Sequence, residues 1–367
     1  MARVAEVVIH RRPIALKRPF VTAIRTAYEI DALIVEVRDS DGRSGWGEAP
    51  TSWRVTGESV ESVSAAVTGP LRDAIIGRAT SDPEELSAGL AHAVARNSSA
   101  RMALDCALYD LAAQEAGIPL FMYLGGRVPS VRTDVTLSAV MDDSELDALC
   151  RTALDFVGSG MTTLKVKVGA GGDDVRALVA VREVVGPAMH LRVDANQGWE
   201  RDEAVRIIGA LEDAGVDLEL VEQPVSRDDV EGLAYVTAHV HTPILADEAV
   251  WTRRELLEII RTRAADMVNV KLAKTGGLCE GLDLVRLALA SGVTPIVGCM
   301  AESHVGIAAG AALASVIDSD QLLTQTAHDL DGGLLLEDSP VQGGVSYDAD
   351  RVELSSAAGT GILGLAP

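Results

Sequence analysis

Short apolar runs recur along the middle of the chain, and each run ends in a charged residue. These charged ends are, in chain order, Lys165 with Lys167, Asp194, Glu222, Asp247 and Lys271. The last four ends are 24 to 28 residues apart, which is close to the roughly 30 residues of a strand–helix–strand unit. The pattern therefore predicts parallel strands that alternate with helices and carry charged side chains at their ends.

The alternation of strand and helix patterns begins at about residue 131. Eight strands are predicted, at residues 135–138, 164–168, 191–194, 218–222, 244–247, 267–271, 295–298 and 322–324. Segments between them, such as 201–214 and 280–290, have the spacing of helices that cover a sheet. Eight parallel strands with intervening helices favour a closed barrel, although no helix pattern follows the eighth strand.

The first third of the chain has a different order of elements. Residues 4–9 and 32–37 have strand patterns, and the turn residues 39–42 would return the chain as a hairpin. Helical patterns follow, the clearest at 101–116. Strands followed by helices predict an α+β domain. We therefore expect three parts: an α+β domain at residues 1–127, the barrel at 128–331, and a segment at 332–367 that packs back on the first domain.

The composition is that of a globular protein with room for a barrel and a further domain. The chain has 367 residues, of which 48% are hydrophobic and 23% charged. Its formal net charge of −22 argues against a nucleic-acid partner and against anionic membranes. The sequence shows neither an apolar span of roughly 20 residues nor a signal peptide, so we expect a cytoplasmic protein. We also expect a homo-oligomer, which an acidic surface permits, and four reduced cysteines.

Two of the charged ends are lysines of one strand. Lys165 and Lys167 are two residues apart, so the strand period directs both amino groups into the mouth of the barrel. Neighbouring cations that are partly desolvated have lowered pKa values, and a neutral lysine can act as a base. The alternative is a solvated lysine pair on a surface strand, because lysine is mostly exposed in proteins.

Three of the charged ends are carboxylates on successive strands. The carboxyl ends of these strands surround one space, where barrel enzymes have their active sites. Three oxygen ligands from Asp194, Glu222 and Asp247, with no histidine or cysteine nearby, favour Mg²⁺ or Mn²⁺ over zinc. Unrelated loop carboxylates are the alternative, but one at each of three successive strand ends is difficult to obtain by chance.

The sixth predicted strand ends in Lys271, across the barrel from Lys167 on the second. A substrate carboxylate bound to a metal between them would have a more acidic α-proton. Two bases on opposite faces of that α-carbon would permit its inversion.

In this order, the motifs resemble those of the enolase superfamily, in its muconate-lactonising subgroup. The resemblance covers nearly the whole chain and includes residues 100–105, 117–120, 124–126, Lys165-Val166-Lys167, Asp194-Ala195-Asn196, Glu222-Gln223-Pro224, Asp247-Glu248 and the run 271–277. It implies an α+β capping domain on a (β/α)7β barrel, with Asp194, Glu222 and Asp247 as Mg²⁺ ligands. It also implies that Lys167 and Lys271 are the acid/base lysines and that Lys165 stabilises the enolate.

The substrate class is indicated by residues after the last predicted strand. Asp329 and Asp331 resemble the Asp-x-Asp motif with which dipeptide epimerases hold the substrate's ammonium group, and two carboxylates at this spacing can share one cation. A polar turn is the alternative. The other expected substrate contacts are Thr136 on the first barrel strand, Met300 in the run 298–303, Trp53 in a capping loop, and Arg25, which resembles the arginine that faces an acidic side chain in Ala-Glu epimerases.

The resemblance predicts an isomerase, a Mg²⁺-dependent dipeptide epimerase. It would invert the α-carbon of the carboxyl-terminal residue of a dipeptide such as L-Ala-L-Glu by two-base proton transfer through an enolate. Other reactions of the subgroup stay open, namely muconate cycloisomerisation, N-acyl amino acid racemisation and o-succinylbenzoate synthesis. So does a non-catalytic barrel that binds a metabolite, although such a protein needs no paired bases. Ala249 and Gly333, where Ser and Pro are usual, leave the substrate's side chains open.

Overall fold

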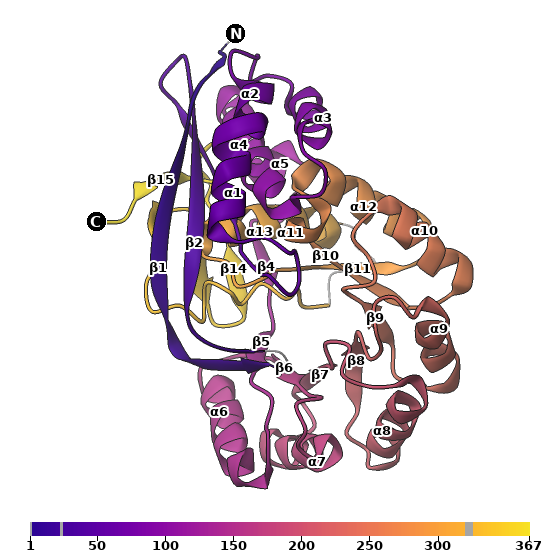
Figure 1. Ribbon diagram of the computed structural model, residues 1–367. Helices are drawn as coiled ribbons and strands as arrows, with labels where there is room; N and C mark the ends of the chain where they lie inside the picture. Colours follow the sequence, from indigo (N-terminus) through magenta and orange to yellow (C-terminus); the bar gives the residue numbers. More distant parts are fainter. Residues whose placement is uncertain (1, 23–24, 320–325) are drawn as a thin grey trace.

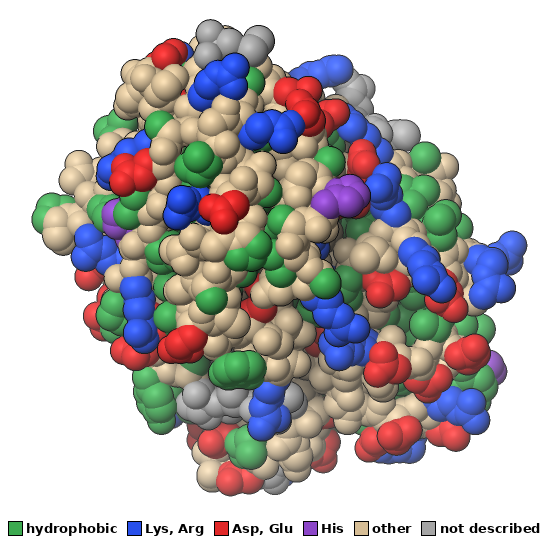
Figure 2. Space-filling view, turned by 45° about the horizontal axis from the view of Figure 1, so that its top comes forward, with side chains coloured by type: hydrophobic (Ala, Val, Ile, Leu, Met, Phe, Trp, Pro, Cys, Tyr) green, Lys and Arg blue, Asp and Glu red, His purple; other side chains and the backbone are tan. Residues whose placement is uncertain are grey.

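The computed structural model describes residues 2–22, 25–319 and 326–367, and it shows a barrel with a second domain packed over it (Figure 1). The indigo and violet first third of the chain forms this capping domain. The elements coloured magenta to orange form the barrel and the helices around it. On the face in Figure 2, acidic and basic side chains are intermixed. Within the described ranges, no helix is long and apolar enough to cross a membrane.

The capping domain is built on one antiparallel sheet with the strand order β1-β2-β3. Its strands are β1 (Val4–Thr22), β2 (Arg25–Asp39) and β3 (Ser44–Ala49). The long helix α4 (Ser98–Ala116) packs on β3. A Cβ atom at Gly45 or Gly47 would lie 2.1 Å or 1.9 Å from a backbone oxygen of α4. Both positions of β3 therefore require glycine, because any side chain would push the helix away.

Further helices complete the capping domain. They are α1 (Val60–Ala66), the π-helical η1 (Val67–Leu71), α2 (Arg72–Ile75), α3 (Pro83–Ala93) and α5 (Leu120–Tyr123). Leu71, Leu104 and Leu108 are fully buried in the core that these helices share with the sheet. The predicted helix at 101–116 is confirmed and begins three residues earlier, at Ser98.

The barrel sheet has seven parallel strands in the order β5 to β11. These strands are β5 (Val135–Leu137), β6 (Thr163–Lys167), β7 (His190–Asp194), β8 (Leu218–Glu222), β9 (Ile244–Ala246), β10 (Met267–Lys271) and β11 (Thr294–Gly298). Alternate residues such as Leu164, Val166 and Val193 belong to the main apolar core. The charged residues between them are therefore directed to the opposite side of the sheet, the barrel interior.

Helices follow the strands as predicted. They are η2 (Asp143–Glu145), α6 (Leu146–Gly158), α7 (Asp174–Val185), α8 (Arg201–Asp213), α9 (Val230–His239), α10 (Arg253–Thr262), α11 (Leu272–Thr275), α12 (Leu278–Ala290) and α13 (His304–Asp318). Capping residues determine where these helices begin. At the start of α10, for example, Thr252 and Glu255 form a capping box.

The barrel is closed by a segment without regular strand structure. The predicted eighth strand at 322–324 lies outside the described residues. Just after it, Asp329 pairs in parallel with Gly298 of β11, and His328 pairs in parallel with Thr133. These two bridges connect the last strand of the sheet to the segment before β5. The closure places Asp329 and Asp331 beside the barrel mouth.

The end of the chain forms short strands that return to earlier elements. They are β12 (Val341–Gly343), β13 (Ser346–Asp348), β14 (Arg351–Glu353) and β15 (Ile362–Leu365), and β14 pairs with β4 (Ser130–Arg132). Val341 and Ile362 share an apolar cluster with Ile34 and Trp46 of the capping sheet.

Two buried carboxylates of the capping domain bind the first turns of barrel helices. Glu48 accepts hydrogen bonds from the backbone N–H groups of Ser303 and Gly306 at α13. Asp105 accepts one from the backbone N–H of Leu278 at α12, at 2.5 Å. Negative charge at a helix N-terminus is favourable, so these carboxylates fix the capping domain over the barrel.

Asp105 gives a testable dependence of stability on pH. Burial raises its pKa to about 6 against hydrogen bonds from Ser87 and Leu278 that lower it. The folded protein therefore holds this proton more tightly than the unfolded chain, and the resulting stabilisation is lost as pH rises from about 4 to about 6. Asp105→Asn should remove this loss. The wild-type unfolding free energy minus that of the variant is expected to fall by about 3 kcal/mol across this interval.

Urea unfolding at a series of pH values measures this difference. Asp147→Asn, at an exposed position of α6, is the control. Parallel pH curves for wild type and Asp105→Asn would contradict the expectation.

Candidate active site

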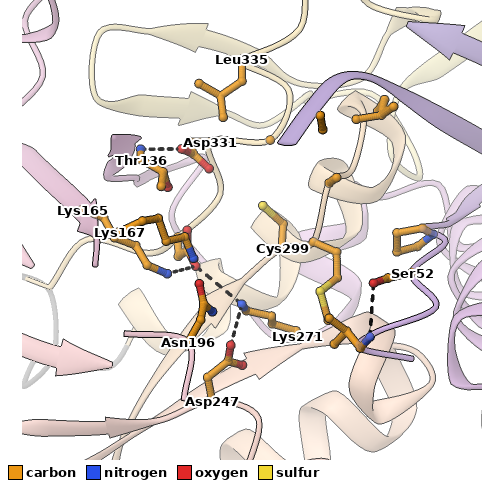
Figure 3. Close-up of a pocket in the computed structure, with 18 of the residues that line it drawn as sticks. Ser52, Thr136, Lys165, Lys167, Asn196, Asp247, Lys271, Cys299, Asp331 and Leu335 are labelled. Carbon is orange, nitrogen blue, oxygen red and sulfur yellow. Dashed lines mark hydrogen bonds and ion pairs between the residues drawn. The ribbon is translucent and has the colours of Figure 1, made fainter. Parts of the chain in front are cut away.

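A pocket lies at the carboxyl ends of the barrel strands, beneath the capping domain (Figure 3). The barrel lines it with charged groups, among them Lys165, Lys167 and Lys271. The capping domain contributes mainly apolar side chains, including Ile30 and Val55. The pocket therefore combines a charged interior with a largely apolar cover.

Lys165 is the most deeply placed of the pocket lysines, with 1% of its surface exposed. Its Nζ lies 2.6 Å from Glu222 Oε2, 2.8 Å from Asp329 Oδ2 and 3.1 Å from Asp194 Oδ2. One ammonium group thus joins three carboxylates that come from different segments. The alternative of a solvated lysine pair is wrong, because both Lys165 and its neighbour Lys167 line the pocket.

Lys167 and Lys271 approach the pocket from opposite sides. They end β6 and β10, which have three strands between them in the sheet order. Lys167 Nζ donates to Asp194 Oδ2 at 2.5 Å, and Lys271 Nζ donates to Asp247 Oδ2 at 2.9 Å. Figure 3 shows the two amino groups directed toward one another across the pocket. A group bound between them would present one face to each lysine.

The prediction that burial and mutual repulsion lower the pKa values of the lysines on β6 is wrong for Lys165. Burial does lower the pKa of Lys165, but Asp329, Glu222 and Asp194 outweigh it and raise the value well above the ordinary one. For Lys271, burial is likewise outweighed by Asp247 and Glu222. The surrounding carboxylates, rather than the second lysine, therefore set the charge state of these amines.

The three carboxylates predicted as metal ligands are buried together at the strand ends. The pKa of Glu222 is raised to about 7 by burial and by Asp194. The pKa of Asp247 is lowered, because Lys271 and Lys274 outweigh the effect of burial. The same balance, with Lys167 and Lys165, lowers the pKa of Asp194. The neighbouring ammonium groups therefore keep the carboxylates of Asp194 and Asp247 in the charged form.

This donor set fits a hard divalent cation. It supplies oxygen ligands alone, as Mg²⁺ requires. Oε2 of the adjacent Glu248 is buried and has no hydrogen-bond partner among the described residues. No three such acidic, histidine or cysteine groups in the described ranges are already arranged around a common metal position. The reason is visible in the geometry, since the ammonium group of Lys165 lies between Asp194 and Glu222.

Two residues that hold the carboxylates were missed by sequence reasoning. Lys274 Nζ donates to Asp247 Oδ1 at 2.6 Å and to the backbone oxygen of Asn269 at 2.9 Å. Asn269 Nδ2 donates to Glu222 Oε1 at 3.0 Å. Asn269 precedes Lys271 by two residues on β10, so the strand period could have identified it as inward-facing. Lys274 lies in the short helix α11, which has no comparable signal.

A second charged layer lies deeper in the barrel. Arg192, with 1% of its surface exposed, donates to Asp134 Oδ2 at 2.9 Å and to Glu219 Oε2 at 2.8 Å. Arg192 precedes Asp194 by two residues on β7 and so faces the same side. Sequence reasoning overlooked it, although the same period-two spacing marks it. This network, buried at Arg192 and Asp134 and partly exposed at Glu219, supports the strand ends that carry the pocket residues.

Asp329 and Asp331 both line the pocket, and each is 4% exposed. Burial raises the pKa of Asp329, but Lys165 and Lys271 outweigh it and lower the value. The pKa of Asp331 is raised to about 6 by burial and by Asp329. Oδ2 of Asp331 accepts a hydrogen bond from the backbone N–H of Thr136 at 2.7 Å. The polar-turn alternative is wrong, because both residues are buried and line the pocket rather than facing solvent.

Met300 also lines the pocket, together with Ala301. Its backbone N–H donates to Glu302 Oε1 at 2.8 Å. Glu302 is buried, and burial together with Glu48 raises its pKa to about 8. The segment that carries Met300 is therefore anchored by buried acidic groups at the joint between the domains.

Two predicted substrate contacts remain, Trp53 and Arg25. Trp53 is 73% exposed and does not line the pocket. It lines an outer cavity that shares Thr51 and Ser52 with the pocket. Arg25 begins β2, and its side chain lies outside the described part of the structure. The roles of Trp53 and Arg25 stay predictions.

Two family models match the chain. Residues 4–125 match the mandelate racemase / muconate lactonizing enzyme N-terminal domain, and residues 148–363 match the enolase C-terminal domain-like family. The chain is 38% identical to the L-Ala-D/L-Glu epimerase of Bacillus subtilis, over 97% of this chain and 95% of that protein. It is also 38% identical to the hydrophobic dipeptide epimerase of Enterococcus faecalis, over 98% and 99% of the two chains.

Solved structures agree with these matches. The substrate-liganded complex of the Bacillus subtilis epimerase superposes with a TM-score of 0.95 at 37% identity and covers 100% of both chains. The Enterococcus faecalis dipeptide epimerase, complexed with Mg and L-Leu-L-Tyr, has a TM-score of 0.91 at 38% identity and covers 98% and 99% of the chains. These neighbours confirm the predicted barrel with its capping domain. The chain therefore belongs to the enolase superfamily, with the paired domains of its mandelate racemase / muconate lactonizing enzyme branch.

Proposed function

We propose that the protein is a Mg²⁺-dependent dipeptide epimerase that inverts the α-carbon of the carboxyl-terminal residue. The observation that carries this proposal is the placement of Lys167 and Lys271 on opposite sides of one pocket that also contains Asp329 and Asp331. The relatives named above as dipeptide epimerases support it.

Asp194, Glu222 and Asp247 would hold the cation, which when bound polarises the substrate carboxylate and acidifies the adjacent α-proton. Lys167 and Lys271 each address one face of the α-carbon. A cation held by Asp194, Glu222 and Asp247 would offset the carboxylates that raise the pKa of Lys271. One lysine in its neutral form would then remove the α-proton at its Nζ, while the other, protonated, would donate a proton from its Nζ to the opposite face. Lys165 holds a positive charge at the base of the site, where negative charge develops during the reaction.

Asp329 and Asp331 would bind the ammonium group of the substrate. Their carboxylates are buried, so an ammonium group between them is attracted more strongly than in water. Thr136 fixes Asp331 through its backbone N–H. The other reactions left open by the sequence would act on substrates without this ammonium group and would have no use for the pair.

Residues of the capping domain and of the segment around Met300 would contact the side chain of the carboxyl-terminal residue and select it. An acidic side chain would be bound by Arg25. Trp53 would close over the substrate when the loop around it moves.

The remaining expectations belong to the same proposal. A division into a capping domain at 1–127, a barrel at 128–331 and a returning segment at 332–367 is supported by an apolar cluster that draws on residues 4–111 alone. Residues of α4 and α5 also join the main core of the barrel. The net charge of −22 supports the absence of nucleic-acid and anionic-membrane partners. A cytoplasmic location and a homo-oligomeric state are part of the same proposal.

Incubation with a panel of L,L-dipeptides and Mg²⁺ in D₂O tests the function. Deuterium at the α-carbon of the carboxyl-terminal residue and accumulation of the epimer are expected. Absence of exchange with every dipeptide would contradict the function. Exchange that persists undiminished after exhaustive chelation would contradict the metal requirement alone.

A further inference from the structure

A second cavity opens beside the active-site pocket, and we refer to it as the side cavity. Its volume is about 530 Å³, and it shares Leu16, Thr136 and Leu335 with the active-site pocket. One wall is the long β1 strand of the capping domain, which reaches down to the region of β5 and α6 in Figure 1. The opposite wall is formed by α6, including Leu149 and Phe156.

The side cavity begins at the proposed ammonium site. Thr136 donates its backbone N–H to Asp331 and at the same time lines both cavities. Leu137, the last residue of β5, and residues 138–140 after it continue along the side cavity. In a dipeptide the amino-terminal side chain is attached to the carbon that bears the ammonium group. An ammonium group held by Asp329 and Asp331 therefore places that side chain near the mouth of the side cavity.

The lining of the side cavity is suited to an apolar group. Leu149, Phe156 and Leu334 contribute to its walls. The cations on its rim already have partners, since Lys17 Nζ donates to the backbone oxygen of Leu334 at 2.8 Å. Arg18 pairs with an aspartate of α6 at 2.9 Å and lies 5.8 Å from the ring centre of Phe156.

Glu145, an acidic residue that lines the side cavity, also has a hydrogen-bond partner. Glu145 Oε2 accepts a hydrogen bond from the backbone N–H of Met141 at 2.7 Å. A charged substrate side chain would have to displace one of these interactions, whereas an apolar one would only replace water.

We propose that the side cavity binds the amino-terminal side chain of the substrate and selects large aliphatic or aromatic residues there. This inference rests on the proposed function and adds the substrate class. Burying leucine or phenylalanine instead of alanine should raise kcat/KM about tenfold or more, since a few buried methylene groups suffice for that ratio. Lysine or aspartate at the same position should give no such gain.

The test compares L-Ala-L-Glu, L-Leu-L-Glu, L-Phe-L-Glu, L-Lys-L-Glu and L-Asp-L-Glu, and then the same series with alanine as the carboxyl-terminal residue. Thr152 of α6 lines the side cavity, and Thr152→Phe should fill it. This variant should lower kcat/KM for the leucine and phenylalanine substrates at least tenfold and leave the L-Ala substrates within about threefold. Thr152→Leu should have an intermediate effect.

Leu154→Phe is the matched control, because Leu154 lies on the same helix, is 46% exposed and does not line the side cavity. Thermal melts establish that the variants are folded. Equal wild-type kcat/KM for alanine, leucine and phenylalanine, or an equal loss for all substrates in Thr152→Phe, would overturn the inference alone. Absence of exchange with every dipeptide would contradict the proposed function and the inference with it.

Discussion

Lys271→Met and Lys167→Met are each expected to lower epimerisation by about 10³-fold, within the usual contribution of acid–base groups. Methionine has a volume close to that of lysine and carries no amine, so packing is largely kept. Each variant loses the base on one face only. Each should therefore still exchange the α-proton of one epimer with D₂O, and the two variants should act on opposite epimers.

Mass spectrometry and NMR of separate L,L- and L,D-dipeptides in D₂O measure this exchange. Lys271→Arg provides a matched comparison, because arginine keeps the positive charge beside Asp247 but is not deprotonated in proteins. It should be as inactive as Lys271→Met if the lysine acts as a base. Exchange of the same epimer by both methionine variants would contradict the two-face arrangement, as would full activity of Lys271→Arg.

The charged strand ends could be predicted because their signal is local. In each apolar run, alternate positions belong to the core and the charged residues between them face the barrel interior, so the series Lys165 to Lys271 follows from the period of the strands. The long helix α4 was identified for the same reason. Asn269 and Arg192 have the same spacing of two residues. They were missed because a polar residue inside a strand is harder to recognise in the sequence than a charged residue at the end of an apolar run.

Other features depend on contacts between distant segments. Glu48 and Asp105 bind helices more than 170 residues away in the sequence, and no local pattern indicates such a partner. The pKa of Lys165 was mispredicted for the same reason. The strand showed Lys165 beside Lys167, whereas the direction of the pKa shift is set by Asp329, Glu222 and Asp194 from other parts of the chain. Closure of the barrel by His328 and Asp329 likewise consists of two isolated bridges without a strand pattern.

Asp329→Asn is expected to lower kcat/KM for dipeptides by about 10²-fold to 10³-fold. It removes a proposed ligand of the substrate's ammonium group and the carboxylate that lies 2.8 Å from Lys165 Nζ. Losing one partner of a buried charge pair costs about 3–5 kcal/mol, which is of this size. Steady-state kinetics of the wild type and the variant on the same dipeptide measure the loss.

Asp331→Asn separates ammonium binding from the support of Lys165. The pKa of Asp331 is raised to about 6, so its carboxylate is charged above that pH and becomes neutral below it. For the wild type, kcat/KM should therefore fall as pH decreases through about 6, a step that reports groups of the free enzyme. Asp331→Asn should lack this step and should act mainly by raising KM. An unchanged pH profile in the variant would assign the step to another group.

Acetylation of the substrate's amino group tests whether Asp329 binds the ammonium group, because it removes that positive charge. Wild-type enzyme should act on N-acetyl-L-Ala-L-Glu at least 10²-fold less efficiently than on L-Ala-L-Glu, because the acetylated substrate has no cation to offset two buried carboxylates. In Asp329→Asn this difference should shrink to about tenfold or less, since only the carboxylate of Asp331 is then left to bind an ammonium group. A uniform loss on both substrates would assign Asp329 to the support of Lys165 alone. Wild-type preference for the acetylated substrate would instead favour racemisation of N-acyl amino acids, a reaction that the same paired lysines could perform.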